Sequence, residues 1–357
     1  MDAHILVINP GSTSTKIAVY NNWKEVFLIN IKHEQKVLQK FKNIFSQYEY
    51  RKNIINEVLK NAGFELSHMD IIVGRGGLLK PIAGGVYIVN DAMLRDLKNP
   101  MGEHESNLGG VIAHELVKES GKDILAIIVD PTCVDEMESI ARLSGIPELP
   151  RRSFLHTLNQ RAIARRFARE NGKKYEEVNV IVAHMGGGIS VGAHSSGRII
   201  DVNNGLNGDG PMSPERSGGV PAGQLVDLCF SGKHTRDAVM KKIKGNGGLS
   251  AYLGSSDAIE IEQRIKDGDP NAKLVYDAMC YQVAKEIGSL STVLYENLDG
   301  ILLTGGLAYS KMITNYISQR VKHLGPVFIY PGEGEMEAMA QNGFYVLTGE
   351  IQAKEYV

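Results

Sequence analysis

The chain has 357 residues, of which 43% are hydrophobic and 22% charged, and its formal net charge is -2. This length predicts two domains of ordinary size, and the near-neutral charge offers no basic field for nucleic acid. No apolar stretch is long enough to cross a bilayer, no signal peptide is recognisable, and three widely spaced cysteines indicate neither disulfides nor zinc, so the cytoplasm is the expected location.

The first elements in chain order are two strands, residues 5–8 and 17–20, joined by a tight turn. Gly11 allows backbone conformations closed to other residues, and Lys16 adds a positive charge. The hydroxyl side chains and amides of the turn could surround an oxyanion. The hydroxyl residues are Ser12, Thr13, Ser14 and Thr15. The alternative is a surface hairpin whose serines and threonines satisfy its own backbone.

Strands and helices alternate along the rest of the chain, which predicts an α/β fold. Strand-like apolar runs occur at residues 24–30, 71–74, 85–89, 124–130, 178–183, 189–193, 198–202, 300–303 and 327–330. Helical periodicity occurs over residues 35–62, 106–120, 134–143, 159–171, 271–296 and 311–322. The basic cluster at residues 161–169 is expected on a solvated helix face.

The two halves of the chain begin alike. Residues 5–30 and 180–203 share one plan: an apolar strand, a polar residue, a glycine-bearing turn, a second strand, a polar turn and a third strand. The alternative is that any two strand-turn-strand segments look similar. Two related α/β halves predict a central cleft between them, with a phosphate-sized turn on each wall.

The glycine turns do not match common nucleotide-binding motifs. The turn before Lys16 is not followed by a helical segment, which distinguishes it from a Walker loop. The second turn, "HMGGGIS" at residues 184–190, leads into a strand and lacks the spaced glycines of a dinucleotide fingerprint. Phosphate binding by both turns remains the interpretation.

Eight segments in order resemble the acetate kinase family of short-chain carboxylate kinases, within the acetate and sugar kinase, heat-shock protein and actin superfamily. They are "NPGSTSTK", "VGRGGLLKPIAGGVY", "VDPTCVDEM", "RRSFLHTLNQ", "AHMGGGISVGAH", "NGDGPMSPERSGGVP", "LTGGLAYS" and "YPGEGEMEAMA". The resemblance implies two similar lobes of the actin-like ATPase (ribonuclease H-like) fold facing a central cleft. It also implies transfer of a phosphoryl group from ATP to a short-chain carboxylate, with Mg²⁺.

This chemistry requires cations more than a base. A carboxylate nucleophile is already ionised at neutral pH, so catalysis depends on positioning and on neutralising charge. Arg75, at the end of an apolar strand, resembles the family arginine that meets the carboxylate and the phosphoryl group. Arg216 resembles a second such arginine, and its planar fork suits phosphate oxygens. Without their neighbours, either would be read as a surface arginine.

The resemblance implies further catalytic residues. His156 resembles the histidine that donates to the phosphoryl group in the transition state, and His184 resembles a phosphate-side contact. The alternative for a lone histidine is a satisfied core residue. Asn9 is also implied to be catalytic, as is Asp130, which ends an apolar strand where α/β ligand sites form.

Acidic and glycine residues complete the implied site. Glu335, at the start of a helical segment, resembles the acid that holds Mg²⁺ or its water, with Glu333 as a rival because the spacing differs from acetate kinases. Gly305 and Gly306 resemble a turn that packs against adenosine. The residues implied in nucleotide or phosphate binding are Ser12, Ser14, Lys16, His184, Gly186, Gly187, Gly305 and Gly306.

The resemblance also implies the domain organisation. Residues 1–155 form the first lobe, on which a C-terminal helix within residues 335–357 packs back, and residues 156–334 form the second, nucleotide-binding lobe. Closure of the lobes would expel water that could otherwise hydrolyse ATP. A homodimer or higher homo-oligomer is expected from the family.

The sequence constrains less strongly which acid is the substrate and whether the chain is an enzyme at all. Glycines directly after Arg75, the absence of a histidine close behind it, and Pro10 in the first turn depart from acetate kinases and favour butyrate or a branched acid. Each methylene discriminates by about 1 to 3 kcal/mol, so overlapping substrates are expected. A nucleotide-dependent switch protein is the non-enzymatic alternative.

Overall fold

The computed structural model describes residues 2–100, 102, 104–295 and 297–357, and the chain folds into two compact units. The first unit comprises Met1–Val134 and Gly334–Val357, and the second comprises Asp135–Glu333. The lobe boundaries expected from the sequence, at residues 155/156 and 334/335, remain a prediction.

The first unit is built on a six-stranded sheet with the order β3-β2-β1-β4-β6-β5. Its strands are β1 (His4–Pro10), β2 (Ser14–Asn21), β3 (Lys24–Lys32), β4 (Ile71–Arg75), β5 (Val86–Ile88) and β6 (Leu125–Val129). Its helices are α1 (Gln35–Leu38), α2 (Tyr48–Asn61), α3 (Asp91–Lys98), α4 (Asn107–Ser120) and α12 (Glu335–Leu347), with 3-10 turns at Phe45–Gln47 and Leu66–His68.

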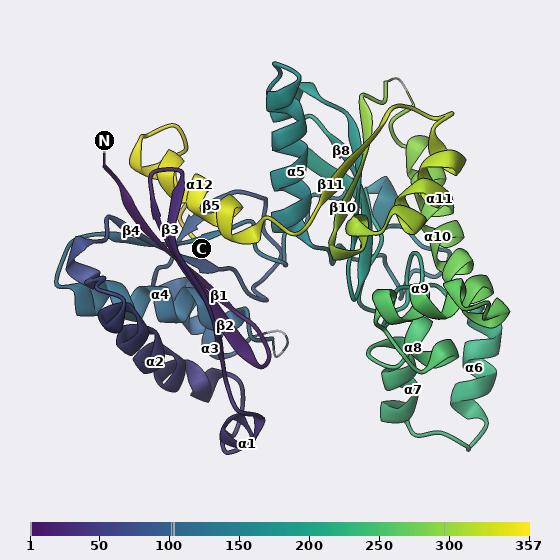
Figure 1. Ribbon diagram of the computed structural model, residues 1–357, viewed down its shortest axis with the longest axis horizontal. Coiled ribbons are helices and arrows are strands. Elements are labelled where there is room, and N and C mark those ends of the chain that lie inside the picture. Colours follow the sequence, from purple (N-terminus) through teal and green to yellow (C-terminus); the bar gives the residue numbers. More distant parts are fainter. Residues whose placement is uncertain (1, 101, 103, 296) are drawn as a thin grey trace. The chain divides into compact units, whose positions relative to one another are not determined.

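Both faces of this sheet are covered at its central strand β1, which explains the unbroken apolar run of that strand. Leu6 and Ile8 belong to the core shared with α2 and α4. On the other face α12, yellow in Figure 1, packs on β1 and β4, where Ile5 lies close to Gly343. All residues from Ile5 to Ile8 are 0% exposed, and each such side chain contributes roughly 1.5 to 3 kcal/mol of transfer free energy.

The second unit contains a five-stranded sheet with the order β11-β10-β7-β8-β9. Its strands are β7 (Val180–Met185), β8 (Ile189–Ser195), β9 (Arg198–Val202), β10 (Gly300–Gly305) and β11 (Val327–Pro331). Its helices are α5 (Thr157–Glu170), α6 (Ala222–Phe230), α7 (Arg236–Ile243), α8 (Gly248–Leu253), α9 (Ala258–Lys266), α10 (Pro270–Ser291) and α11 (Lys311–Val321). Single 3-10 turns lie at Ile140–Arg142, Tyr175–Glu177 and Gly306–Tyr309.

The predicted repeat of topology is confirmed. In each unit an antiparallel meander, β1-β2-β3 or β7-β8-β9, is continued from its first strand by two parallel strands. These are β4 and β6 in the first unit and β10 and β11 in the second (Figure 1). Even the irregularity between the second and third strands recurs, after Val19 and after Ala193. The antiparallel edge strand β5 belongs to the first unit alone.

One expectation from local periodicity is wrong, and a second holds only in part. Residues 134–143 contain only a 3-10 turn, because their polar groups bond elsewhere: Glu136 pairs with Arg161 at 2.9 Å, and the Glu138 amide donates to Ile200 at 2.9 Å. Arg161 is 6% exposed, so the basic cluster on α5 is not wholly solvated.

Five helices, α3 and α6 to α9, are not predicted from the periodicity of the sequence. They are six to nine residues long, so periodicity has little length in which to appear. Within the described ranges, no helix combines the length and apolarity needed to cross a membrane.

Candidate active site

Three predicted residues from distant parts of the chain meet in the first unit. Asn9 lies near the end of β1, Arg75 ends β4, and Glu335 begins α12. Arg75 Nη1 donates to Asn9 Oδ1 at 3.2 Å and pairs with the Glu335 carboxylate, to which Asn9 Nδ2 also donates at 2.9 Å. The side chain of Glu335 is 7% exposed and that of Arg75 20%. The pair is therefore largely shielded from water, at the carboxyl ends of two parallel strands.

Close packing determines where Arg75 lies. A Cβ atom on Gly109 of α4 would lie 2.4 Å from the carbonyl oxygen of Arg75, so only glycine allows the helix to approach this strand end. A Cβ atom on Gly76 would lie 2.4 Å from Cβ of Pro131, in the loop after β6. The segment around Arg75 is thus held between α4 and that loop.

The turn between β1 and β2 has its carbonyl groups directed into the protein. The guanidinium of Arg51, on α2, donates to the carbonyl oxygens of Gly11 at 2.8 Å and Ser14 at 3.0 Å. It donates to that of Ser12 at 3.2 Å, and the carbonyl of Thr13 accepts from the first amide after β3 at 2.8 Å. Arg51 itself is 0% exposed.

This arrangement directs amides outward. In a trans peptide the carbonyl and the next amide point in opposite directions, so the inward carbonyls of Gly11 and Ser12 turn the amides of Ser12 and Thr13 away from Arg51. Lys16 is paired with Asn9 in the β1-β2 register. Outward amides beside hydroxyls and a lysine fit the predicted phosphate-binding role of Ser12, Ser14 and Lys16.

Arg51 is a supporting residue that the sequence reading missed, although a signal existed. Arg51, Ile55 and Leu59 are spaced four apart on α2, and all three are buried. An arginine on the apolar stripe of a helix is seldom buried unless its charge has a specific partner. Here the partners are backbone carbonyls 37 to 40 residues away.

We expect Arg51→Met to lower the free energy of unfolding by about 2 kcal/mol or more, because it leaves buried carbonyls without a donor. Arg51→Lys keeps the charge but not the planar fork of the guanidinium, so we expect a smaller loss of stability. Urea denaturation of both variants measures these effects. Lys60→Met, at an exposed position of the same helix, is the matched control. An Arg51→Met variant as stable as the wild type would contradict the role of Arg51 in stabilising the turn between β1 and β2.

Asp130 follows β6, whose Val129 is paired with Arg75 in the sheet. Its amide donates to the Gly85 carbonyl at 2.9 Å, and its Oδ1 accepts from the Gly85 amide at 2.7 Å. Asp130 is 1% exposed and has φ 38°, a strained conformation for a residue with a side chain. The structure therefore holds this carboxylate in place beside the end of β4.

In the second unit His156 and His184 are stacked, with ring centroids 3.9 Å apart and an interplanar angle of 16°. His184 is the penultimate residue of β7, which is buried along its whole length, and its Nδ1 lies 2.7 Å from Asn159 Oδ1. Asn159 Nδ2 donates to the carbonyl of Glu333, so its Oδ1 is the acceptor and His184 Nδ1 carries a proton. His156, immediately before α5, is only partly buried.

The glycine turn after His184 contacts Arg216. A Cβ atom on Gly188 would lie 2.0 Å from Arg216 Nη1, so the guanidinium packs directly on this turn. The Gly187 carbonyl accepts from Ser213 Oγ at 2.7 Å. Arg216 also donates to the Gly205 carbonyl, and burial lowers the pKa of its guanidinium. The predicted residues Gly186 and Gly187 therefore lie on the turn against which the Arg216 guanidinium packs.

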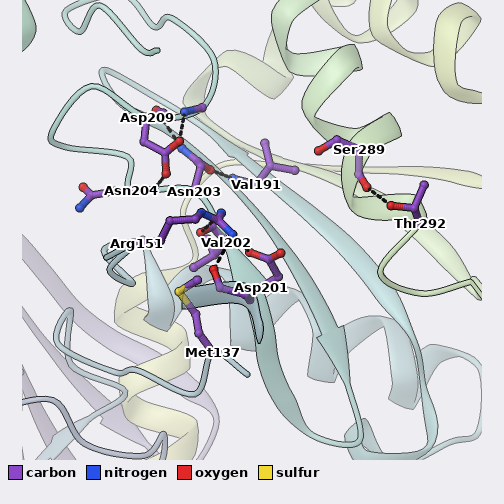
Figure 2. Close-up of polar contacts among 12 residues, drawn as sticks. Met137, Arg151, Val191, Asp201, Val202, Asn203, Asn204, Asp209, Ser289 and Thr292 are labelled. Carbon is purple, nitrogen blue, oxygen red and sulfur yellow. Dashed lines mark hydrogen bonds and ion pairs between the residues drawn. The ribbon is translucent and has the colours of Figure 1, made fainter. Parts of the chain in front are cut away.

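Arg216 is borne on a loop that Asn203 anchors to β8. The Val191 amide donates to Asn203 Oδ1 at 2.7 Å, and the Asn204 amide donates to Asp209 Oδ2 at 2.9 Å (Figure 2). A Cβ atom on Gly210 would lie 2.3 Å from Asn203 Nδ2. These contacts give a loop of irregular structure a defined path.

The remaining predicted residues lie at the ends of β10 and β11. Gly305 has φ 88°, and a Cβ atom there would lie 2.3 Å from the Met185 carbonyl oxygen, whereas one on Gly306 would meet no atom within 4 Å. Glu333 is exposed and belongs to the second unit, whereas Glu335 is buried with Arg75 in the first. The two rivals for the metal-side acid therefore have different surroundings.

Two buried histidines near these sites predict acid sensitivity. Burial lowers the pKa of His194 to about 3 and that of His33 to about 4, the latter helped by Arg51. Below pH 6.5 these histidines bind protons in the unfolded chain but stay neutral in the folded protein. The free energy of unfolding therefore decreases as the pH is lowered, by up to about 1.4 kcal/mol per pH unit for His194. Urea denaturation midpoints between pH 7.5 and 4.5 measure how stability depends on pH.

We expect His194→Gln to make this pH dependence weaker. His68→Asn, at an exposed position, is the control and should leave it unchanged. An unaltered pH dependence in His194→Gln would contradict the role of buried His194.

The residues offer Mg²⁺ no resident cage. No group of three or more histidine, cysteine or acidic side chains that could hold a metal occurs among the residues described. A single carboxylate such as Glu335 fits Mg²⁺ that arrives with nucleotide phosphates and keeps most of its waters.

The sequence-predicted residues thus form two clusters. The first unit brings together Asn9, Arg75 and Glu335, next to Lys16 and Asp130 along the strand ends. The second unit brings together His156, His184, Arg216 and the glycine turns.

Two units that each continue a three-stranded meander with parallel strands, and that carry polar clusters at the strand ends, define the actin-like ATPase fold. The chain belongs to the acetokinase family, whose model matches residues 148–330. Butyrate kinase 2 of Clostridium acetobutylicum is 54% identical to it over 357 residues, which is 100% of both chains.

Solved structures show the same fold. An acetate kinase from Porphyromonas gingivalis aligns with a TM-score of 0.77 and 18% identity over 97% of this chain and 100% of that one. A propionate kinase from Francisella tularensis aligns with a TM-score of 0.76 and 18% identity over 95% and 98%.

Proposed function

We propose that the chain transfers the γ-phosphoryl group of MgATP to a short-chain carboxylate, most readily butyrate, giving an acyl phosphate and ADP, and that the reaction is reversible. The observation that carries the proposal is the Asn9–Arg75–Glu335 contact at the strand ends of an acetokinase-family chain. A carboxylate oxygen attacks the γ-phosphorus as the bond to the bridging oxygen of ADP breaks, and no proton has to be removed from the nucleophile.

The roles of the residues follow from this chemistry. Arg75 and Arg216 neutralise charge on the transferring group and on the carboxylate, and His156 donates to the equatorial oxygens as charge spreads over them. The outward amides at Ser12 and Thr13, with Lys16 and the 186–188 turn, bind nucleotide phosphates. Glu335 would hold Mg²⁺ or one of its waters, and Gly305 and Gly306 lie against the nucleoside.

Butyrate is proposed because the full-length relative at 54% identity is a butyrate kinase. The glycines after Arg75 do not by themselves argue for a larger acyl pocket, since Pro131 and Asn107 fill the space beside Gly76 and Gly77. Isobutyrate, isovalerate, propionate and acetate are the competing substrates.

A hydroxylamine-trapping assay tests the proposal. The purified protein with ATP and Mg²⁺ is offered each of these acids, and acyl hydroxamate is measured beside a carboxylate-free control. We expect hydroxamate with the highest kcat/KM for butyrate. ADP release without hydroxamate would support the nucleotide-dependent switch instead.

We also propose a homo-oligomer located in the cytoplasm, where ATP is available. The apolar helix α6 supports self-association, because Val226 is 54% and Phe230 87% exposed. Light scattering should give at least twice the mass of one chain, and Val226→Asp with Phe230→Asp should reduce it. A wild-type monomer would contradict this proposal.

A further inference from the structure

A chain of buried polar side chains leads to His156 through the interior of the second unit. Tyr175 Oη lies 2.8 Å from His194 Nδ1, and His194 Nε2 lies 3.0 Å from Gln160 Oε1. Gln160 Nε2 lies 2.9 Å from Ser190 Oγ, which lies 2.9 Å from His156 Nδ1. Gln160, Ser190 and His194 are 0% exposed and Tyr175 is 5% exposed. The role proposed above for His156 makes no use of this chain.

A backbone carbonyl determines the direction of the first bonds. The amide group of Gln160 lies 3.0 Å from the carbonyl oxygen of Ser190, which can only accept, so the atom facing it is Nε2. Gln160 Oε1 therefore faces His194 Nε2, and His194 donates there. Burial lowers the pKa of His194 to about 3, so its ring is neutral and its Nδ1 accepts from the Tyr175 hydroxyl.

The hydroxyl of Ser190 is oriented in turn. Its oxygen accepts from Gln160 Nε2 at 2.9 Å and from the backbone amide of His156 at 3.3 Å. A hydroxyl oxygen has two acceptor positions, so both are taken and the hydroxyl proton is left to be donated. The atom in line to receive it is His156 Nδ1.

We propose that Ser190, Gln160 and His194 are positioning residues that set the tautomer of His156, leaving Nδ1 without a proton and Nε2 as the donor. Tyr175 closes the far end of this relay. The stacked His184 differs from His156 at this atom, because its Nδ1 carries a proton that it donates to Asn159. The catalytic consequence rests on the proposed function, since a donor at Nε2 matters only if His156 meets the phosphoryl group.

The relay gives His156 a fixed tautomer, which a histidine without such partners lacks. A neutral imidazole whose proton can occupy either nitrogen donates from Nε2 only part of the time, and correcting the tautomer during reaction would cost rate. Here the bond directions are set by groups that are fully buried, so the donor is present before substrate binds. This is pre-organisation built by side chains that do not touch the substrate.

Nitrogen-15 spectra of histidine-labelled protein without ligand test the tautomer directly. We expect His156 to show a protonated Nε2 and a bare Nδ1 at neutral pH. Ser190→Ala removes the donor, and Gln160→Met keeps the Ser190 hydroxyl but frees one acceptor position on it. Both variants should give mixed tautomers. They should also lower kcat by roughly ten- to a hundredfold, with KM for ATP and butyrate within a few fold.

Two further variants separate the relay from general destabilisation. Ser190→Thr keeps the hydroxyl and should recover the wild-type spectrum and part of kcat. Thr157→Val removes a buried hydroxyl with no hydrogen-bond partner among the described residues, one position from His156, and should change neither. Melting curves identify any variant that does not fold.

The outcomes distinguish the relay from the proposed function. A proton on Nδ1 of wild-type His156, or an unchanged spectrum in both Ser190→Ala and Gln160→Met, would overturn the relay whatever the activity. The expected spectra in a protein that makes no acyl phosphate would leave the relay standing and reject the proposed function.

Discussion

Replacing Arg75 by alanine is expected to lower kcat by about a hundredfold or more, which corresponds to roughly 3 kcal/mol of lost transition-state stabilisation. Arg75 is the cation that we place on the carboxylate and the transferring phosphoryl group, and Asn9 and Glu335 hold it at the end of β4. The same loss is expected for Arg216→Ala. Steady-state kinetics with ATP and butyrate measure it.

Stability requires its own control, because Glu335 is buried. Alone, Arg75→Ala leaves this carboxylate without its cation, at a cost of up to about 3 kcal/mol given the partial exposure of Arg75. The double variant Arg75→Ala with Glu335→Gln removes the unpaired charge and should regain stability without turnover. Near-normal kcat in a folded Arg75→Ala protein would show that the arginine was misassigned.

The second large effect is expected at His156. If His156 donates a hydrogen bond to the phosphoryl group in the transition state, the His156→Ala variant should fold normally. It should keep its KM values within a few fold and lose mainly kcat. Glutamine offers an amide donor of similar reach and should recover part of the loss. Melting curves and steady-state constants for wild type, alanine and glutamine decide the matter.

The alternative, a packed core histidine, predicts the reverse pattern. His156 stacks on His184 and contacts Ser190, so its removal also deletes packing. If those contacts are its whole role, His156→Ala should lower the melting temperature while the folded fraction turns over normally. A destabilised alanine variant with unimpaired kcat would therefore falsify the donor assignment.

Local patterns were informative where burial leaves a periodic signal. The meanders at β1-β2-β3 and β7-β8-β9 were predictable because their apolar strands are short, bounded by turns and repeated in both halves. Residues 134–143 misled the same reasoning: their spacing is helical, but Glu136 and the Glu138 amide bond to partners far along the chain. Short helices such as α8 carry too few residues for any period.

By itself, the sequence determined the family, the α/β repeat and the residue types at the strand ends, because motifs and hydrophobic periods are short-range properties of the chain. Only the tertiary structure decided that Glu335 pairs with an arginine 260 residues away and that Arg51 braces the first turn. It also decided that a buried relay orients His156. These contacts depend on sheet order and on the helices that pack over it, and a buried charge or hydroxyl finds its partner only after those distant elements have come together.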